Sequence, residues 1–159
     1  MDLLAAVLMH AGVDIHDGLR AAWQAHYPVA DWAGLPPVLR YASWIGGDRD
    51  GHPGVTAEVT GQTLAWLRRA GVSQQRETAC SLFGSLSLSS RQAPVSDELH
   101  SAIAKATESW PSLEGRLAAI PPTETYRRWL TIVDWRLQES GRLHPSAPAP
   151  AGGYQSSAE

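Results

Sequence analysis

SWIGGDRDGHPGVT, residues Ser43 to Thr56, joins an apolar lead-in, Val38–Ala42, to a long helical pattern. Four glycines and one proline fall within nine residues of this stretch. Glycine permits positive φ and close approach of backbones, whereas proline fixes φ and removes a donor. The charges of Asp48, Arg49 and Asp50 lie inside this tight backbone. The stretch therefore predicts a loop that presents polar groups where a strand gives way to a helix.

Helices are predicted on both sides of the loop, with one short strand before it. Residues 1–27 carry apolar side chains at helical spacing, and Gly12 lies where this helix would break in two. Residues 38–45 are apolar and end in an aromatic and a branched residue, which is typical of a short buried strand in a parallel sheet. Thr56 is expected to cap the next helix, and Ser96 a later one.

The clearest helical pattern follows Thr123, the expected cap. Its apolar stripe is Tyr126, Trp129, Leu130, Val133 and Leu137. Its other face carries Arg127, Arg128, Asp134 and Glu139, and the pair Arg127–Arg128 is expected to be solvated. The preceding residues 110–122 are predicted to be weakly structured, and residues 141–159, rich in Pro, Ala and Gly, to be a linker or tail. The sequence thus predicts a mostly α chain with a helical part at 1–140 and at most one or two short strands.

Bulk properties are those of one ordinary globular domain of 159 residues, with 43% hydrophobic and 18% charged residues. The formal net charge of −3 gives no sign of a surface for nucleic acid or acidic membranes. A single cysteine, Cys80, excludes an internal disulfide and a cysteine-rich zinc site, and its apolar neighbours predict a buried thiol. The apolar run Leu3–Met9 is too short to span a bilayer and follows no basic residue, so a cytoplasmic location is expected.

Three interpretations of residues 46–56 follow from the residues alone. The two aspartates ahead of Gly51 have the spacing of a calcium loop, but residues 52–55 supply no side-chain oxygens to complete one. Glycines before a helix can cradle phosphate, but the GK[ST] ending and the GxGxxG spacing are missing. The third interpretation is a structural turn in which Arg49 neutralises the flanking carboxylates, and the residues alone favour it.

The same stretch closely resembles the SWxGGDRDGNPxVT signature of phosphoenolpyruvate carboxylase. His52, in place of the usual Asn, is its one clear departure. Residues 17–28 resemble the family's helix and loop before the signature. Residues 86–99 resemble its LS-S…EL segment, and residues 126–137 its PYR…L helix. The resemblance covers residues 15–139 well, and it shifts the balance from a purely structural turn toward a functional loop.

The resemblance implies part of a large, mostly helical α/β barrel that works as a homotetramer. Such enzymes condense phosphoenolpyruvate with bicarbonate to give oxaloacetate and phosphate, and they use Mg²⁺ or Mn²⁺. It also implies that Trp44 binds substrate, as part of the apolar pocket around the substrate's methylene group. The residues implied to shape and hold the loop are Gly46, Gly47, Asp48, Arg49, Asp50 and Gly51.

Several parts of the family pattern are missing from this chain. It has no TAHPT string, which carries the family's catalytic histidine, no glycine- and arginine-rich phosphate loops and no acidic metal ligands. The chain is therefore expected to be an internal fragment of the barrel, with no catalytic residue, no bound metal and no activity alone. The alternative is a non-catalytic helical interaction module that keeps the signature turn, with seven tryptophans available for a binding surface.

The resemblance also predicts the geometry of the loop. Trp44 should be partly exposed although it ends an apolar strand. Gly46 and Gly47 should hold a backbone that alanine cannot follow without strain. Asp48 and Asp50 should be bonded to backbone amides or to Arg49, and should not bind a metal.

Overall fold

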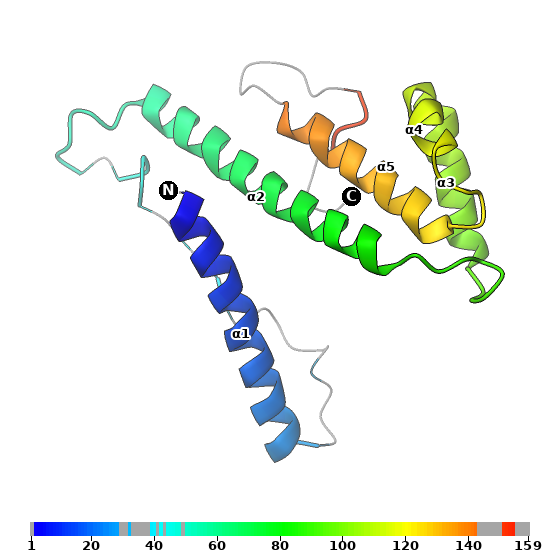
Figure 1. Cartoon of the computed structure of the whole chain (residues 1–159). Coiled ribbons are helices and arrows are strands. Elements are labelled where there is room, and N and C mark those ends of the chain that lie inside the picture. Colours follow the sequence, from blue (N-terminus) through cyan, green and yellow to red (C-terminus); the bar gives the residue numbers. More distant parts are fainter. Residues whose placement is uncertain are drawn as a thin grey trace. The chain divides into compact units, whose positions relative to one another are not determined.

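The computed structural model describes residues 2–28, 32, 39–40, 42, 44–48, 50–142 and 151–154. Its elements are α1 (Asp2–His26), α2 (Ala57–Ser85), α3 (Asp97–Ser109), the 3₁₀ turn η1 (Pro111–Leu113), α4 (Glu114–Ala118) and α5 (Thr125–Gly141) (Figure 1). The prediction of a mostly helical chain is confirmed. The chain divides into two compact units, Met1–Thr63 and Leu64–Glu159. None of the described helices combines the length and the hydropathy that a membrane span needs.

The first unit contains α1, the loop and the first two turns of α2. Helix α1 runs without interruption through Gly12, so the allowance for a break there was wrong. It stops before Pro28 as predicted, with the amide of Tyr27 bonded to the carbonyl of Trp23. The Trp23 ring lies 4.6 Å from that of Tyr27 and 6.2 Å from that of Trp32.

The predicted strand at 38–45 is wrong for the residues that the structure describes. Leu39, Arg40, Ala42 and Trp44 have no strand structure, and Ile45 lies in a turn. The apolar side chains are not buried either, since Leu39 is 41% exposed and Ile45 46% exposed. The reason is that a strand of a parallel sheet exists only where a neighbouring strand supplies hydrogen bonds, and no described segment of this chain is a strand.

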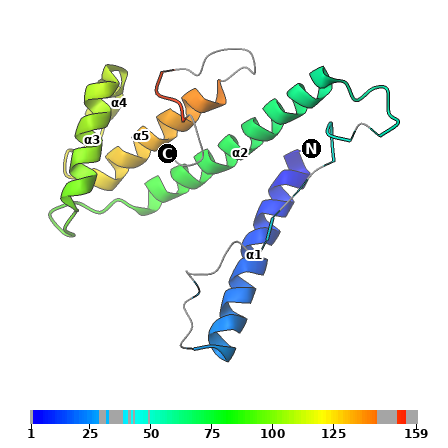
Figure 2. The ribbon, with the colours of Figure 1, turned by 180° about the vertical axis from the view of Figure 1, so that it is seen from behind.

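The second unit is built around α5, as Figures 1 and 2 show. Its core consists of Ile103 and Ala106 of α3, Leu113 and Leu117 of η1 and α4, and Ile132 and Trp135 of α5. Ser96 caps α3 as predicted, with its hydroxyl oxygen accepting the amide of Leu99 at 3.4 Å. Burial of one face of each short helix, more than intrinsic propensity, holds this part of the chain together.

The expectation that residues 110–122 are weakly structured was wrong. Leu113 and Leu117, four residues apart, are 0% and 2% exposed and form the centre of the core. The charged side chain of Arg128 bonds the carbonyls of Leu117 at 3.1 Å and Ile120 at 3.3 Å, at the end of α4. A cation at a helix C-terminus satisfies carbonyls that have no intrahelical partner. Two turns of helix are therefore fixed by packing and by a distant arginine.

Helix α5, which the structure describes in full, has no exposed residue. The side chains of Arg127 and Arg128 are half-buried, so the prediction that this pair is solvated was wrong, and Asp134 and Glu139 are half-buried as well. The predicted apolar stripe was also only partly right, because Leu137 of the stripe is buried but the deepest side chain is Ile132. The helix begins at Thr125 after Glu124, which makes no side-chain cap bond, and not after a Thr123 cap. A helix contacted on several sides has no single apolar stripe.

Within this second unit, α2 and α5 lie side by side and antiparallel (Figures 1 and 2). At one end, Arg127 donates from Nε to the carbonyl of Phe83 at 3.0 Å and its guanidinium lies 4.6 Å from the centre of the Phe83 ring. At the other end, Arg68 donates to the carbonyl of Ser140 at 3.5 Å. Long arginine side chains therefore bridge these two helices.

Cys80 is exposed, so the prediction of a buried thiol was wrong. Its neighbour Ala79 is 5% exposed and is the buried residue of α2. Successive residues of a helix are turned by about 100° from one another, which places the side chain of residue 80 on a different face.

Residues Ala151–Tyr154, within the predicted linker, pack on the end of α5. The amide of Tyr154 donates to Ser140 Oγ at 2.7 Å, and Arg136 donates from Nε to the carbonyl of Gly152 at 3.0 Å. The Arg136 guanidinium lies 3.9 Å from the centre of the Tyr154 ring and 5.0 Å from that of Trp110. Gly152 has φ +95°, and a Cβ there would overlap the indole of Trp135. The remaining residues of the linker lie outside the described ranges, except Gly141 and Arg142 at the end of α5.

Candidate functional site

Trp44 begins the loop and is 78% exposed, in agreement with the expectation of partial exposure. Its carbonyl accepts the amides of Gly47 at 3.1 Å and Asp48 at 3.3 Å. These two bonds close a turn directly after the indole, so four of the predicted site residues, Trp44, Gly46, Gly47 and Asp48, come together in one turn. A wide apolar ring on a closed turn is a surface that an apolar part of a ligand can contact.

Gly46 fixes this turn to α2. Its carbonyl accepts the hydroxyl of Thr60 at 2.7 Å, and its φ of +67° lies in the left-handed region that favours glycine. A Cβ at Gly46 would overlap the side chain of Thr63. Both the backbone conformation and the close approach of α2 therefore require glycine at this position, as predicted.

Gly47 does not meet the same prediction. Glycines with positive φ among the described residues are Gly46, Gly51 and Gly152 only. A Cβ at Gly47 would come no closer than 3.9 Å to another atom, the carbonyl oxygen of Trp44. The expectation that alanine would be strained at Gly47 was therefore wrong. Two adjacent glycines in a turn can differ in φ, and only the one with positive φ needs to be glycine.

The two aspartates of the loop are joined by a local bond. The carboxylate of Asp48 accepts the amide of Asp50 at 3.0 Å, which confirms a backbone amide partner for Asp48. Gly51 follows with φ +72°, and a Cβ added there would meet no atom within 4 Å, so conformation and not space selects glycine at this position. Arg49 lies outside the described residues.

The end of the loop forms the start of α2. Thr56 Oγ1 accepts the amide of Val59 at 3.3 Å, so the predicted cap is confirmed. Sequence reasoning missed Thr60 and Thr63, the two side chains of α2 that meet Gly46. A signal was present, because Thr56, Thr60 and Thr63 recur at spacings of four and three and so share one face of the helix.

The residues that the structure describes give no metal centre. No three His, Cys, Asp or Glu side chains among them come together in an arrangement that could hold a metal ion. One oxygen of Asp48 is already occupied by the amide of Asp50. The described part of the chain thus does not fit the Mg²⁺ or Mn²⁺ that the resemblance implies.

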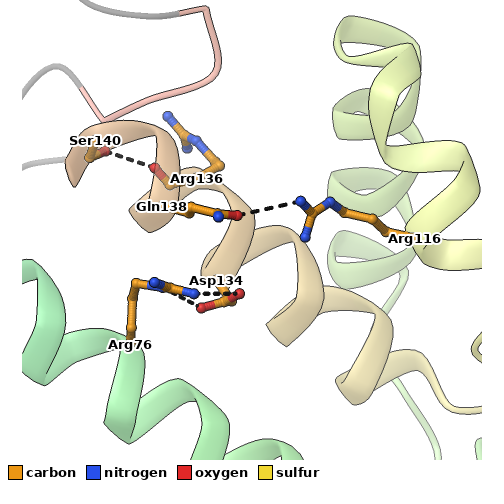
Figure 3. Close-up of polar contacts among 6 residues, drawn as sticks. All are labelled: Arg76, Arg116, Asp134, Arg136, Gln138 and Ser140. Atoms are coloured by element: carbon orange, nitrogen blue, oxygen red, sulfur yellow. Dashed lines mark hydrogen bonds and ion pairs between the residues drawn. The ribbon is translucent and has the colours of Figure 1, made fainter. Parts of the chain in front are cut away.

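A second group of polar contacts lies in the other unit and joins helices (Figure 3). Arg76 of α2 donates to both carboxylate oxygens of Asp134 of α5, at 2.7 and 3.4 Å. This hydrogen bond raises the pKa of Arg76, against the opposing effect of partial burial. Arg116 bonds Gln138 at 3.4 Å, which ties α4 to α5. These side chains are occupied with one another, so they stabilise the helical unit and do not form a candidate catalytic group.

Comparison with known proteins connects the loop to one family. The sequence model described as phosphoenolpyruvate carboxylase matches residues 1–150. A phosphoenolpyruvate carboxylase of Roseiflexus castenholzii is 40% identical over 119 residues, which are 75% of this chain and 13% of the relative. One of Nocardia farcinica is 39% identical over 138 residues, which are 86% of this chain and 14% of the relative. One of Methylorubrum extorquens is 34% identical over 123 residues, which are 77% of this chain and 13% of the relative.

The matched residues of the chain span about an eighth of the length of these relatives. No solved structure matches it. The family model covers nearly all of this sequence, including the whole of the loop that carries Trp44. The chain belongs to the phosphoenolpyruvate carboxylase family.

Proposed function

We propose that this chain is the part of a phosphoenolpyruvate carboxylase that carries the Trp44 loop. The complete enzyme condenses phosphoenolpyruvate with bicarbonate to give oxaloacetate and phosphate, as a homotetramer in the cytoplasm. Family membership over residues 1–150 supports the assignment to the enzyme. The observation that carries the role of the loop is the 78% exposed indole on a turn that is bonded to α2.

Trp44 is proposed to form one apolar wall around the methylene group of phosphoenolpyruvate. An indole offers a broad, rigid apolar face, and excluding water protects a reactive enolate from unwanted protonation. The two amide bonds to the Trp44 carbonyl and the Thr60–Gly46 bond support this role, because they fix the backbone on which the ring is carried. The other residues of the loop, Gly46 to Gly51, are positioning residues in this proposal.

The chain is proposed to be inactive by itself. No general base and no metal ligand of the reaction is assigned to its residues, so the proton transfer and the charge stabilisation that the reaction needs have no group to supply them. In the complete enzyme, Mg²⁺ or Mn²⁺ would stabilise the negative charge that develops in the reaction. The residues that hold this metal are proposed to lie in other parts of the enzyme. A coupled assay for oxaloacetate with phosphoenolpyruvate, bicarbonate and Mg²⁺ should read at background for the pure 159-residue chain. Turnover above background would overturn this part of the proposal.

The role of Trp44 is tested in a complete phosphoenolpyruvate carboxylase that carries the SWxGGDRDGNPxVT signature. Replacing the tryptophan of that signature by alanine should lower kcat/KM for phosphoenolpyruvate by roughly tenfold to a hundredfold, because the substrate loses one apolar contact surface. A phenylalanine variant should retain most of the activity, because it keeps an apolar ring. Both variants should keep the wild-type Tm, because the indole is exposed. An unchanged kcat/KM in the alanine variant would leave the loop as a structural turn, as in the interaction-module alternative.

A further inference from the structure

The C-terminal end of α5 holds a short segment of the chain, residues 152–154, by its main chain. The buried hydroxyl of Ser140 accepts the amide of Tyr154 at 2.7 Å and donates to the carbonyl of Arg136 at 2.8 Å. Arg136 donates from Nε to the carbonyl of Gly152 at 3.0 Å. From α2, Arg68 donates to the carbonyl of Tyr154 at 3.4 Å. Groups of two helices therefore bond the main chain at both ends of the segment.

Only glycine fits the first two positions of this segment. Gly152 has φ +95°, and a Cβ there would overlap the buried indole of Trp135. A Cβ at the buried Gly153 would lie 3.3 Å from the amide nitrogen and 3.4 Å from the Cα of Ser140. These are main-chain atoms of a packed helix, which do not move aside as the end of a flexible side chain does. The shape of the site thus selects two consecutive glycines.

The third position of the segment contacts a charged group. The guanidinium of Arg136 lies 3.9 Å from the centre of the Tyr154 ring and 5.0 Å from the centre of the Trp110 ring. A guanidinium stacks on aromatic faces and is attracted by their electron density. The site therefore favours an aromatic side chain after the two glycines.

The segment is attached to the helices without being part of their core. The core side chains of this unit belong to α3, η1, α4 and α5. Residues 152–154 bring only one side chain larger than hydrogen, and that ring stacks on an arginine. A segment that is held by hydrogen bonds and buries little apolar surface opens locally at a smaller free-energy cost than global unfolding.

We propose that the end of α5 is a recognition site for a Gly-Gly-aromatic segment. Residues 152–154 occupy this site as a latch, which opens while the helices stay folded. The site then accepts the same sequence from a separate peptide. The proposal concerns the second unit alone and stands whether or not Trp44 lines a substrate pocket.

Hydrogen exchange in the full chain, followed by NMR, tests the latch. The amide of Tyr154 should be protected, but it should exchange at least about tenfold faster than that of Ile132 in the core, and low concentrations of urea should not change its rate. Gly152→Ala should lower the protection of the Tyr154 amide about tenfold or more and leave that of Ile132 unchanged. The control is Gly115→Ala in α4, where a Cβ meets no atom within 4 Å, and it should change neither amide.

A peptide tests the recognition site. Fluorescein-labelled PAGGYQS, the sequence of residues 150–156, should bind the Gly152→Ala chain saturably, as measured by fluorescence anisotropy. It should bind the wild-type chain at least about tenfold more weakly, because the chain's own segment competes. The peptide PAAGYQS should bind the variant at least about tenfold more weakly than PAGGYQS. Should Gly152→Ala not fold, Tyr154→Ala also weakens the chain's own segment and should accept the same peptide.

Three results would overturn the proposal. An unchanged Tyr154 amide in Gly152→Ala would mean that the glycine does not hold the latch. An equal fall in protection at Ile132 would make residues 152–154 part of the cooperative core. Equal binding of the two peptides, or no binding to either variant chain, would show that the site does not recognise the sequence.

Discussion

Thr125 carries a buried hydroxyl that the structure leaves without a partner, and removing that hydroxyl should stabilise the protein. The residue is 1% exposed, and its Oγ1 bonds no group among the residues that the structure describes. A buried, unsatisfied hydroxyl costs about 1–3 kcal/mol relative to one left in water. Thr125→Val keeps the branched shape and replaces the hydroxyl by a methyl group. The two residues have similar helix propensities, so the backbone contributes little to the difference.

We expect Thr125→Val to raise the free energy of unfolding by about 1–2 kcal/mol, in the lower part of that range. For a chain of this size, each kcal/mol raises the Tm by about 2–4 °C. Urea denaturation followed by far-ultraviolet circular dichroism measures the change, and the slope with denaturant should stay constant.

The control is Thr131→Val, six residues further along α5. The hydroxyl of Thr131 donates to the carbonyl of Arg127 at 2.9 Å, so its removal breaks a bond. That variant should be neutral or less stable by up to about 1 kcal/mol. Equal effects of the two substitutions would mean that valine itself, and not the orphan hydroxyl, is responsible. Destabilisation by Thr125→Val would refute the reasoning and indicate a partner for the hydroxyl.

Three other outcomes are expected. Gly46→Ala should lower hydrogen-exchange protection of the loop amides about tenfold or more, since an alanine in the left-handed conformation costs about 1–2 kcal/mol. Gly47→Ala should leave that protection unchanged, and equal effects of the two substitutions would contradict the assignment of strain to Gly46 alone. A double-mutant cycle of Arg76→Ala and Asp134→Ala, measured by urea denaturation, should give a coupling free energy of about 1 kcal/mol, because solvent screens this partly exposed pair. A coupling of zero would show that the pair is not formed in solution. Trp129→Ala should cost about 2–3 kcal/mol, because the ring packs at the edge of the core, and a loss under about 1 kcal/mol would place it in solvent.

Local signals predicted the helices well where they act through the backbone. Ser96 and Thr56 cap helices because a hydroxyl reaches an amide three residues on, and that geometry depends on nothing outside the segment. Pro28 likewise ends α1 because of its own ring. By contrast, the strand at 38–45 depends on partners from elsewhere, and its apolar pattern alone could not supply them.

In the candidate site too, features set by the local backbone were predicted, whereas features that depend on other segments were not. Glycine at 46 was predicted because positive φ is a local property, but the reason that α2 approaches so closely lies in Thr60 and Thr63, seventeen residues away at most. The same need for glycine was predicted at Gly47 from the residue type alone. The structure shows neither a positive φ nor a close contact at Gly47 that would exclude alanine. The exposure of Trp44 was expected from the resemblance to a family, and periodicity alone would have buried it.

The arginines of α5 have a consequence for which positions tolerate substitution. Arg127, Arg128 and Arg136 each donate to main-chain carbonyls of another segment. A main-chain carbonyl is present whatever the side chain, so exchanging Ile120 or Phe83 for another residue leaves the acceptor in place. The arginines themselves cannot be replaced by lysine in the same way, because lysine lacks the planar guanidinium that donates to these carbonyls. These three main-chain bonds are therefore encoded in the arginines alone, whereas the Phe83 ring under Arg127 and the Arg76–Asp134 and Arg116–Gln138 bonds need matching side chains on both segments.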